Sequence, residues 1–355
     1  MDEVIGRPDD VPPTAGGPPG VSVPQVVPLI AGGALLLVSC VELVGLPDLS
    51  YRGEGRHLTS VREGEHQPVV SGDRVVWLDS EAGSLELYDL EADTVRTLVR
   101  SPAPILGHDV QDGRLVWSVA LDTSTRAGGG PTRLELMNLR DGTRRTLGDD
   151  SVRMVRPSLW GNRVVWEDHR HGNAEIYSLN LEFGSVTRLT DDPDPDHDPV
   201  VWQDLVAWVR GQSGRVHLLD LQSGAHHVIP GSVATGRPDL RGGHLVWEDR
   251  RGPSYDVYHY DVATGQQERL GSSLDVDQFG SDQRDPSVSG AVVVWQDTRW
   301  GPDDIYLYDL TTGTERLIDT GLGSYRAEPD ISEGTVVWVG DDRLGDYGLY
   351  GLDLP

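Results

Sequence analysis

The sequence contains no lysine and a single cysteine, Cys40, among its 355 residues. Its 30 basic side chains are therefore all arginine, and they face 57 acidic ones, which gives a net charge of −27. A polyanionic partner such as DNA and an anionic membrane face are both disfavoured electrostatically. One cysteine also excludes an intramolecular disulfide. The composition is typical of a soluble, acidic extracellular or salt-adapted protein with no nucleic-acid partner.

Several motifs of catalytic sites are missing as well. The chain has no G-x-S-x-G elbow, P-loop, H-E-x-x-H or sialidase Asp-box, and no α/β-hydrolase domain is expected beside the repeats. A zinc site would need ligands from several distant segments. No long stretch shows the apolar period of a helix, whereas 43 glycines and 23 prolines suit a structure with many turns. These absences argue against nucleophilic catalysis and against a helical fold.

What the sequence does contain is a repeat, seen best in PSVSGAVVVWQDTRWGPDDIYLYDLTTGTERLI from Pro286 to Ile318. Turn residues divide this segment at Ser289-Gly290, around Gly301-Pro302 and at Thr312-Gly313. Between them lie runs rich in valine, isoleucine, tyrosine and threonine, which predict four strands at about 286–289, 291–297, 304–310 and 314–318. The second run is apolar at consecutive positions, so we expect its sheet to be covered on both faces.

Two residue types mark the repeat along the chain. A tryptophan ends each second strand, at intervals of 39 to 49 residues: Trp77, Trp117, Trp166, Trp208, Trp247, Trp295 and Trp338. Nine residues earlier stands a proline, which His108 replaces in the second repeat: Pro68, Pro157, Pro199, Pro238, Pro286 and Pro329. This period is that of propeller blades.

The two ends of the repeat region complement each other. The last repeat stops after its third strand, and the segment 55–59 resembles the fourth strand of other repeats, such as 186–190. An N-terminal strand would then complete the last blade and close the ring, which removes exposed sheet edges. We predict an all-β, seven-bladed propeller of four-stranded antiparallel blades, with six blades as the alternative.

The repeat resembles the TolB-type propeller family. The similarity rests on a proline, a turn glycine, an apolar strand ending in an aromatic residue, an Asp-x-Arg and an Ile/Val-Tyr strand, as in WEDHRHGNAEIY from Trp166 and WQDTRWGPDDIY from Trp295. It covers about residues 51–355 and implies architecture rather than activity. TolB itself has a six-bladed ring behind an α/β domain, whereas this sequence shows seven repeats and no room for that domain.

The first 50 residues differ from the repeats. Residues 2–25 are rich in proline and glycine and predict disorder. The apolar run 26–38 is too short to span a bilayer comfortably but suits a signal-peptide core, and Leu37-Val38-Ser39-Cys40 resembles a bacterial lipobox. We expect a leader at 1–40 with lipidation at Cys40, a tether at 41–50 and a propeller at 51–355. This predicts a monomer in the cell envelope that touches the membrane only through a lipid anchor.

Candidate binding residues lie just before the prolines, where first strands begin at the mouth of the channel. Tight turns occupy one face of a propeller, so variable loops and these side chains mark the other face as the functional surface. The candidates are His66, Arg156, His197, Asp198, Arg237, Arg284, Asp285 and Glu328. Their mixed charges are also compatible with simple pairing among themselves.

Two acidic patterns need separate interpretation. The Asp-x-Arg pairs recur blade after blade, so we expect ion pairs within blades rather than a catalytic role. The loop from Asp191 to Asp198 could bind Ca²⁺ through Asp191, Asp192, Asp194 and Asp196, and so could Asp275, Asp277 and Asp282, although neither has EF-hand spacing. No cofactor is certain; Ca²⁺ is the candidate.

Three functions fit the sequence. The first is a non-enzymatic envelope scaffold that binds a protein, peptide or polysaccharide. The second is a lactonase- or lyase-like propeller enzyme that uses histidine, aspartate and glutamate at the channel mouth with a metal. The third is a purely structural surface protein. The regularity of the blades favours the first, because rings of this kind often serve as rigid platforms.

Overall fold

The structure is a computed structural model that describes residues 55–62, 66–122, 129–271, 281–299, 301, 303–318, 325–341 and 346–354. The predictions for the leader, the tether, Cys40, Asp275 and Asp277 lie outside these ranges. Within them, no helix has the length and apolar character needed to cross a membrane.

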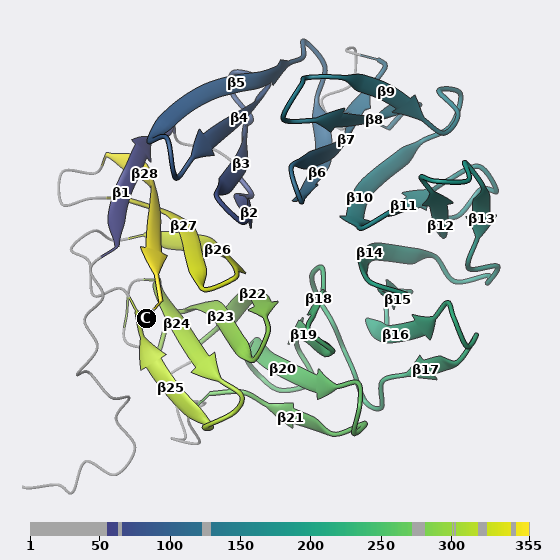
Figure 1. Cartoon of the computed structure of the whole chain (residues 1–355). Helices are drawn as coiled ribbons and strands as arrows, with labels where there is room; N and C mark the ends of the chain where they lie inside the picture. The colour runs from purple at the N-terminus through teal and green to yellow at the C-terminus, as the bar shows by residue number, and fades with distance from the viewer. Residues whose placement is uncertain are drawn as a thin grey trace, which may run out of the picture. The chain divides into compact units, whose positions relative to one another are not determined.

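The described residues form seven four-stranded antiparallel sheets, arranged as the blades of a ring (Figure 1). The innermost strands of blades 1 to 7 are β2 (Val69–Ser71), β6 (Ile105–Gln111), β10 (Met154–Trp160), β14 (Asp196–Trp202), β18 (Asp239–Arg241), β22 (Gln283–Ser289) and β26 (Arg326–Ser332). The second strands are β3 (Arg74–Asp79), β7 (Arg114–Ala120), β11 (Arg163–Asp168), β15 (Leu205–Arg210), β19 (His244–Asp249), β23 (Val292–Asp297) and β27 (Thr335–Asp341).

The third and fourth strands lie progressively further from the axis. The third strands are β4 (Ser84–Asp89), β8 (Thr132–Asn138), β12 (Glu175–Asn180), β16 (Arg215–Asp220), β20 (Asp256–Asp261), β24 (Asp304–Asp309) and β28 (Tyr347–Asp353). The outer strands are β5 (Thr94–Arg100), β9 (Arg144–Leu147), β13 (Val186–Arg188), β17 (His226–Val228), β21 (Gln267–Arg269), β25 (Thr314–Leu317) and, for blade 7, β1 (Arg56–Ser60). The prediction of seven blades is confirmed, and the six-blade alternative is wrong.

The core lies between neighbouring blades, as the apolar second strands require. All seven marker tryptophans are buried, from Trp77 at 3% exposure to Trp338 at 0%. One cluster joins Val246 and Val257 of blade 5 to Trp295 and Tyr306 of blade 6. Burying a large apolar side chain contributes about 1.5–3 kcal/mol. Each blade therefore depends on two neighbours for its stability.

The ring is closed by the N-terminal strand, as the repeat boundaries predict. Strand β1 pairs with β28, with Arg56 opposite Gly351 and Ser60 opposite Gly348, and lies beside it in Figure 1. A Cβ on Gly55 would lie 2.3 Å from the ring of buried Trp338, so the entry to β1 requires glycine. The closure thus depends on hydrogen bonds and on close packing.

The Asp-x-Arg pairs make a repeated cluster within blades, which confirms their predicted structural role. In blade 6, Asp297 accepts hydrogen bonds from Trp295 Nε1 at 3.0 Å and Arg299 Nε at 2.9 Å. The guanidinium of Arg299 lies 4.3 Å from the ring centroid of Tyr306. The same contacts recur through Asp168 and Arg170 in blade 3 and through Asp249 and Arg251 in blade 5. We call these the Trp-Asp-Arg clusters.

Candidate functional site

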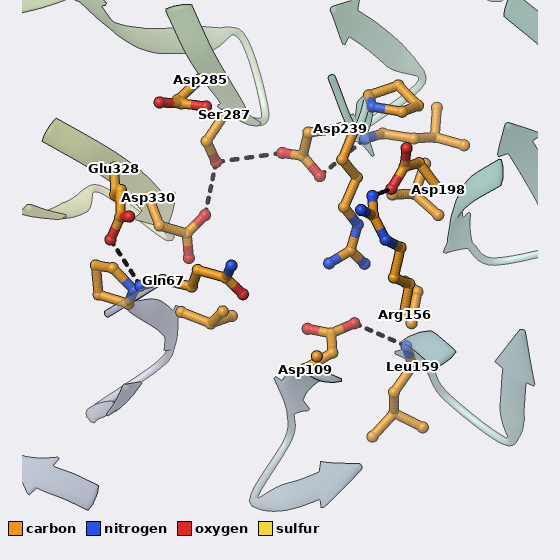
Figure 2. Close-up of a pocket in the computed structure, with 18 of the residues that line it drawn as sticks. Gln67, Asp109, Arg156, Leu159, Asp198, Asp239, Asp285, Ser287, Glu328 and Asp330 are labelled. Atoms are coloured by element: carbon orange, nitrogen blue, oxygen red, sulfur yellow. Dashed lines mark hydrogen bonds and ion pairs between the residues drawn. The ribbon is translucent and has the colours of Figure 1, made fainter. Parts of the chain in front are cut away.

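A cavity of about 510 Å³ lies where the seven innermost strands meet, and residues of every blade line it. Prolines of the repeat line it: Pro286 and Pro329 stand in the middle of their innermost strands, and Pro68 and Pro238 directly before theirs. Figure 2 shows Asp285, Glu328 and Asp330 on one side and Arg156 with Asp198 on the opposite side. The polar lining residues are Gln67, Asp109, Arg156, Ser158, Asp198, Arg237, Asp239, Arg241, Asp285, Ser287, Glu328 and Asp330.

A local backbone feature turns the residue before each proline toward this cavity. Five of these residues have left-handed backbones with φ between 45° and 55°: Gln67, Arg156, Asp198, Asp285 and Glu328. In four of these blades the pairing of first and second strands shifts register at this point, as in a β-bulge. A non-glycine residue in this conformation costs about 1–2 kcal/mol, and bulges often re-aim a side chain beside a site. The same backbone conformation thus recurs at equivalent positions of five blades.

This geometry separates the eight predicted binding residues into two groups. The five that line the cavity stand directly before a proline: Arg156, Asp198, Arg237, Asp285 and Glu328. His66, His197 and Arg284 do not line it. His66 and His197 stand two residues before their prolines, and so does Arg284. The bulge turns only the last residue before the proline inward.

Arg284 and His66, which do not line the cavity, contact other parts of the protein. Arg284 forms an ion pair with Asp282 at 3.0 Å and stacks on Tyr255, 3.8 Å from the ring centroid. His66 is 2% exposed, and its ring nitrogens have no hydrogen-bond partner among the described residues. Burial accordingly lowers its pKa. Neither residue can meet a ligand in the cavity.

His197 belongs to a second cluster, formed with Glu167 and His169. Its Nδ1 lies 3.2 Å from Glu167 Oε2, and His169 Nε2 lies 2.8 Å from Glu167 Oε1. Burial raises the pKa of Glu167, but the hydrogen bonds of the two imidazoles outweigh burial and lower it to about 2. The hydrogen bond to Glu167 raises the pKa of His197 in turn. One carboxylate is thus shared by histidines of blades 3 and 4.

In five blades the residue directly after the proline, or after His108 in blade 2, belongs to a layer below the mouth, which the sequence analysis missed. Their side chains accept hydrogen bonds from backbone N–H groups of the next blade: Asp109 from Leu159 at 2.7 Å, Ser158 from Val201 at 3.3 Å, Asp239 from Val288 at 2.8 Å, Ser287 from Ile331 at 3.4 Å and Asp330 from Val70 at 2.7 Å. The last of these crosses the ring closure. The two-residue period of a strand could have revealed this layer, because residues on either side of a proline share a face.

Within that layer, Ser287 lies between two carboxyl groups. Its Oγ is 2.7 Å from Asp330 Oδ1 and 3.2 Å from Asp239 Oδ2. Burial and the nearby Asp239 raise the pKa of Asp330 to about 6. At the mouth, burial and Glu328 raise the pKa of Asp285. Blades 5 to 7 therefore place acidic groups in a setting that disfavours their ionisation.

Arg241 spans the bottom of the cavity. From blade 5 it reaches Ser332 Oγ of blade 7 at 3.2 Å and Gln111 Oε1 of blade 2 at 3.4 Å. Its guanidinium also lies 5.5 Å from the ring centroid of Trp160 in blade 3. One side chain therefore connects four blades and supplies a positive floor.

The charges of the cavity are mostly not paired with each other. Arg156 and Asp198 form an ion pair. Arg237 donates only a long hydrogen bond, of 3.5 Å, to Pro157 O, and Arg241 bonds to neutral groups. Within the described part of the chain, no arginine or histidine lies within ion-pair distance of any of these four lining carboxylates: Asp109, Asp239, Asp285 and Asp330. These four carboxylates thus line the cavity without forming an ion pair, although Arg237 and Arg241 oppose the rise in the pKa of Asp109, and Arg241 that of Asp330, at longer range.

In the acidic loop of blade 4, three of the four aspartates predicted to bind Ca²⁺ form ion pairs with arginines instead. Asp191 pairs with Arg188 at 2.6 Å, Asp192 with Arg210 at 2.7 Å, and buried Asp196 with both Arg210 and the indole of Trp208. Asp194 stays exposed. Among the residues that the structure describes, no three acidic, histidine or cysteine side chains converge as metal ligands would. Blade 4 therefore also has a Trp-Asp-Arg cluster, formed by Trp208, Asp196 and Arg210. Its aspartate lies on the first strand of the blade, whereas in the other clusters it follows the tryptophan by two residues.

Comparison with known proteins identifies the fold. No family profile and no curated protein matches the sequence. Among solved structures, puromycin hydrolase matches with a TM-score of 0.62 at 15% identity, over 83% of this chain and 52% of its own. The β-propeller domain of Cps50 (Swd1) from Myceliophteria thermophila gives 0.59 at 14%, over 85% and 100%. TolB from Acinetobacter baumannii gives 0.47 at 19%, over 79% and 64%.

The chain therefore spans about half the length of puromycin hydrolase, and at such identities the likeness shows the β-propeller fold alone.

Proposed function

We propose that this chain is a non-enzymatic, TolB-like propeller of the bacterial cell envelope that binds a protein, peptide or polysaccharide in its channel-mouth cavity. The observation that supports this most is the set of carboxylate and guanidinium groups left without each other as partners in one 510 Å³ cavity. Ligand pockets typically enclose about 300–1,000 Å³. The strained residues before the prolines support the same face, because such strain persists where a site needs a side chain aimed.

Affinity capture from envelope extract tests this function with the full-length protein. The cavity variant carries Asp285→Asn and Arg237→Gln. The matched control carries Glu182→Gln and Arg140→Gln, which change the same charges at exposed turns on the outside of the ring. We expect one protein or glycan to be recovered in stoichiometric amount by the wild type and the control but not by the cavity variant. Equal recovery by the cavity variant would contradict binding in the cavity.

The envelope location rests on the lipobox-like segment that ends at Cys40, outside the described residues. If Cys40 carries the anchor, Cys40→Ala should move the protein from the membrane fraction to the soluble fraction. Retention of this variant in the membrane fraction would remove the anchor from the proposal while leaving the cavity unaffected.

A second candidate function is hydrolysis or elimination at the rim of the channel. The observation that favours it is the Glu167 carboxylate held by His169 and His197, since such pairs can move protons. A screen of lactones and uronate-containing glycans would test it. Turnover that is lost in Glu167→Gln but kept in Asp285→Asn would favour this function over binding in the cavity.

A further inference from the structure

Acidic and basic side chains from different blades line the same cavity. The charges of these side chains restrict the chemical class of the ligand more than the volume of the cavity does. Asp285 and Glu328 lie at the mouth in blades 6 and 7, and Asp330 lies below them. Arg237 of blade 5 lines the same space at the mouth, with Arg241 as the floor. Asp285 and Arg237 line one cavity, and neither has an ion-pair partner among the described residues. A ligand that pairs with both must itself carry both charges.

We propose that the cavity binds a small dipolar molecule that carries an ammonium group and a carboxylate, namely a free amino acid or a short peptide with both termini unblocked. This inference rests on the proposed binding function and names the ligand class of the same cavity. The ammonium group would lie against Asp285, and the carboxylate would lie against Arg237. Guanidinium is suited to a carboxylate, because its planar donors can form two parallel hydrogen bonds.

Two further observations agree with this assignment. The pKa values of Asp285 and Asp330 are both raised, in each case by burial first and by a neighbouring carboxylate second, so an incoming cation would relieve an existing repulsion. The Arg156–Asp198 pair occupies the opposite wall and is already neutral as a pair. It therefore leaves Asp285 and Arg237 as the charged groups of the mouth that have no ion-pair partner among the described residues.

A test uses the full-length protein and isothermal titration with alanine, Ala-Ala and Ala-Ala-Ala, each free, N-acetylated, C-amidated or blocked at both ends. We expect at least one free form to bind, and each single block to weaken binding by about tenfold or more, as loss of one charged partner does. Comparing alanine with the two peptides shows whether the ligand is a free amino acid or a short peptide, since both carry an ammonium group and a carboxylate. Ca²⁺ alone is titrated in parallel.

Two variants assign each end of the ligand to its wall. In Asp285→Asn, N-acetylation should no longer matter while C-amidation still does; in Arg237→Gln the pattern should be reversed. Asparagine tolerates the left-handed backbone of position 285, so that variant is expected to fold. The control with Glu182→Gln and Arg140→Gln should bind as the wild type does, and melting curves confirm that each variant is folded.

Equal affinity for free and blocked peptides, affinity for Ca²⁺ alone, or no affinity for any of these molecules would overturn the dipolar ligand. This failure is distinct from failure of the proposed function. If capture from envelope extract still depends on Asp285 and Arg237 while blocking groups have no effect, the cavity binds something else. If capture does not depend on them, the binding function of the cavity fails as well.

Discussion

The Trp-Asp-Arg clusters and the channel mouth use the same two charged residue types in opposite ways. In the clusters, each aspartate is buried and bonded to an arginine and an indole, as Asp297 is to Arg299 and Trp295. At the mouth, Asp285 and Arg237 line one cavity without pairing. The clusters also recur from blade to blade, whereas the residue before the proline changes from glutamine to arginine, aspartate and glutamate around the ring.

This difference teaches how to separate structure from function in a repeat protein. A group that every blade needs is repeated and satisfied by its own blade, because an unpaired buried charge would cost several kcal/mol. A group that serves one ligand has no reason to repeat, and it stays open to solvent until the ligand arrives. Substitutions in the two regions, and removal of the strand that closes the ring around both, test this difference.

The largest effect should come from removing β1, because both regions depend on a closed ring. Deleting residues 56–60 leaves β28 as an exposed edge and uncovers the cluster that joins Leu58 to Trp77 and Val337. We expect the melting temperature to fall by roughly 10 °C or more. Gly55→Val should give a smaller fall, because its side chain would strike Trp338. An unchanged melting curve for the deletion would contradict closure by β1.

Asp297→Asn should break a Trp-Asp-Arg cluster while preserving its shape. The amide would present a donor to the N–H groups of Trp295 and Arg299, and Arg299, whose side chain is 2% exposed, would lose its ion pair with Asp297 and keep the one with Glu315. We expect a loss of about 3 kcal/mol in the free energy of unfolding, measured by urea denaturation. A loss below about 1 kcal/mol would show that the folded protein does not depend on the ion pair between Arg299 and Asp297.

Asp330→Asn should change how stability depends on pH. The pKa of Asp330 is about 6 in the folded protein, above its ordinary value of 3.8, so the folded state binds more protons between these limits. This carboxyl therefore makes the free energy of unfolding fall as pH rises from about 4 to about 6. Asparagine removes that decline and can keep the bonds to Val70 and Ser287. Unfolding curves at pH 4, 5, 6 and 7 should show the variant gaining on the wild type as pH rises; a constant difference would contradict the raised pKa.

The smallest effect on stability should come from the mouth itself. Asp285→Asn and Arg237→Gln each remove a charge that has no ion-pair partner among the described residues, and asparagine suits the left-handed backbone at position 285. We expect each to shift the free energy of unfolding by no more than about 0.5 kcal/mol in urea. If either costs as much as Asp297→Asn, the mouth is a structural cluster like the others, and the contrast between the two regions fails.

The structure also shows how far the site could be predicted from residue order. The prolines marked the segments that line the cavity, but the prediction that each begins an innermost strand is wrong: Pro286, for example, stands in the middle of β22, because pairing with β23 already starts at Gln283. They did not show which of two adjacent polar residues faces the channel. In Arg284-Asp285 and His197-Asp198, the bulge and the left-handed backbone turn the second residue inward and leave the first outside. The prediction of calcium at the loop from Asp191 overlooked Arg210, which lies on the next strand and takes two of its aspartates.

The sequence by itself determined the blades: seven repeats of turn glycines, alternating strands and marker tryptophans, with a spare strand at the N-terminus to complete the last one. Apart from the spare strand, which pairs with the far end of the chain, these features are local, since turns and strand pairing within a blade involve residues close in sequence. Only the tertiary structure decided what meets across the axis. Arg241 lies 130 residues from Gln111, and Asp330 lies 260 from Val70. No spacing in the chain encodes such contacts, because they follow from the curvature of the closed ring and from the bulges that aim each side chain.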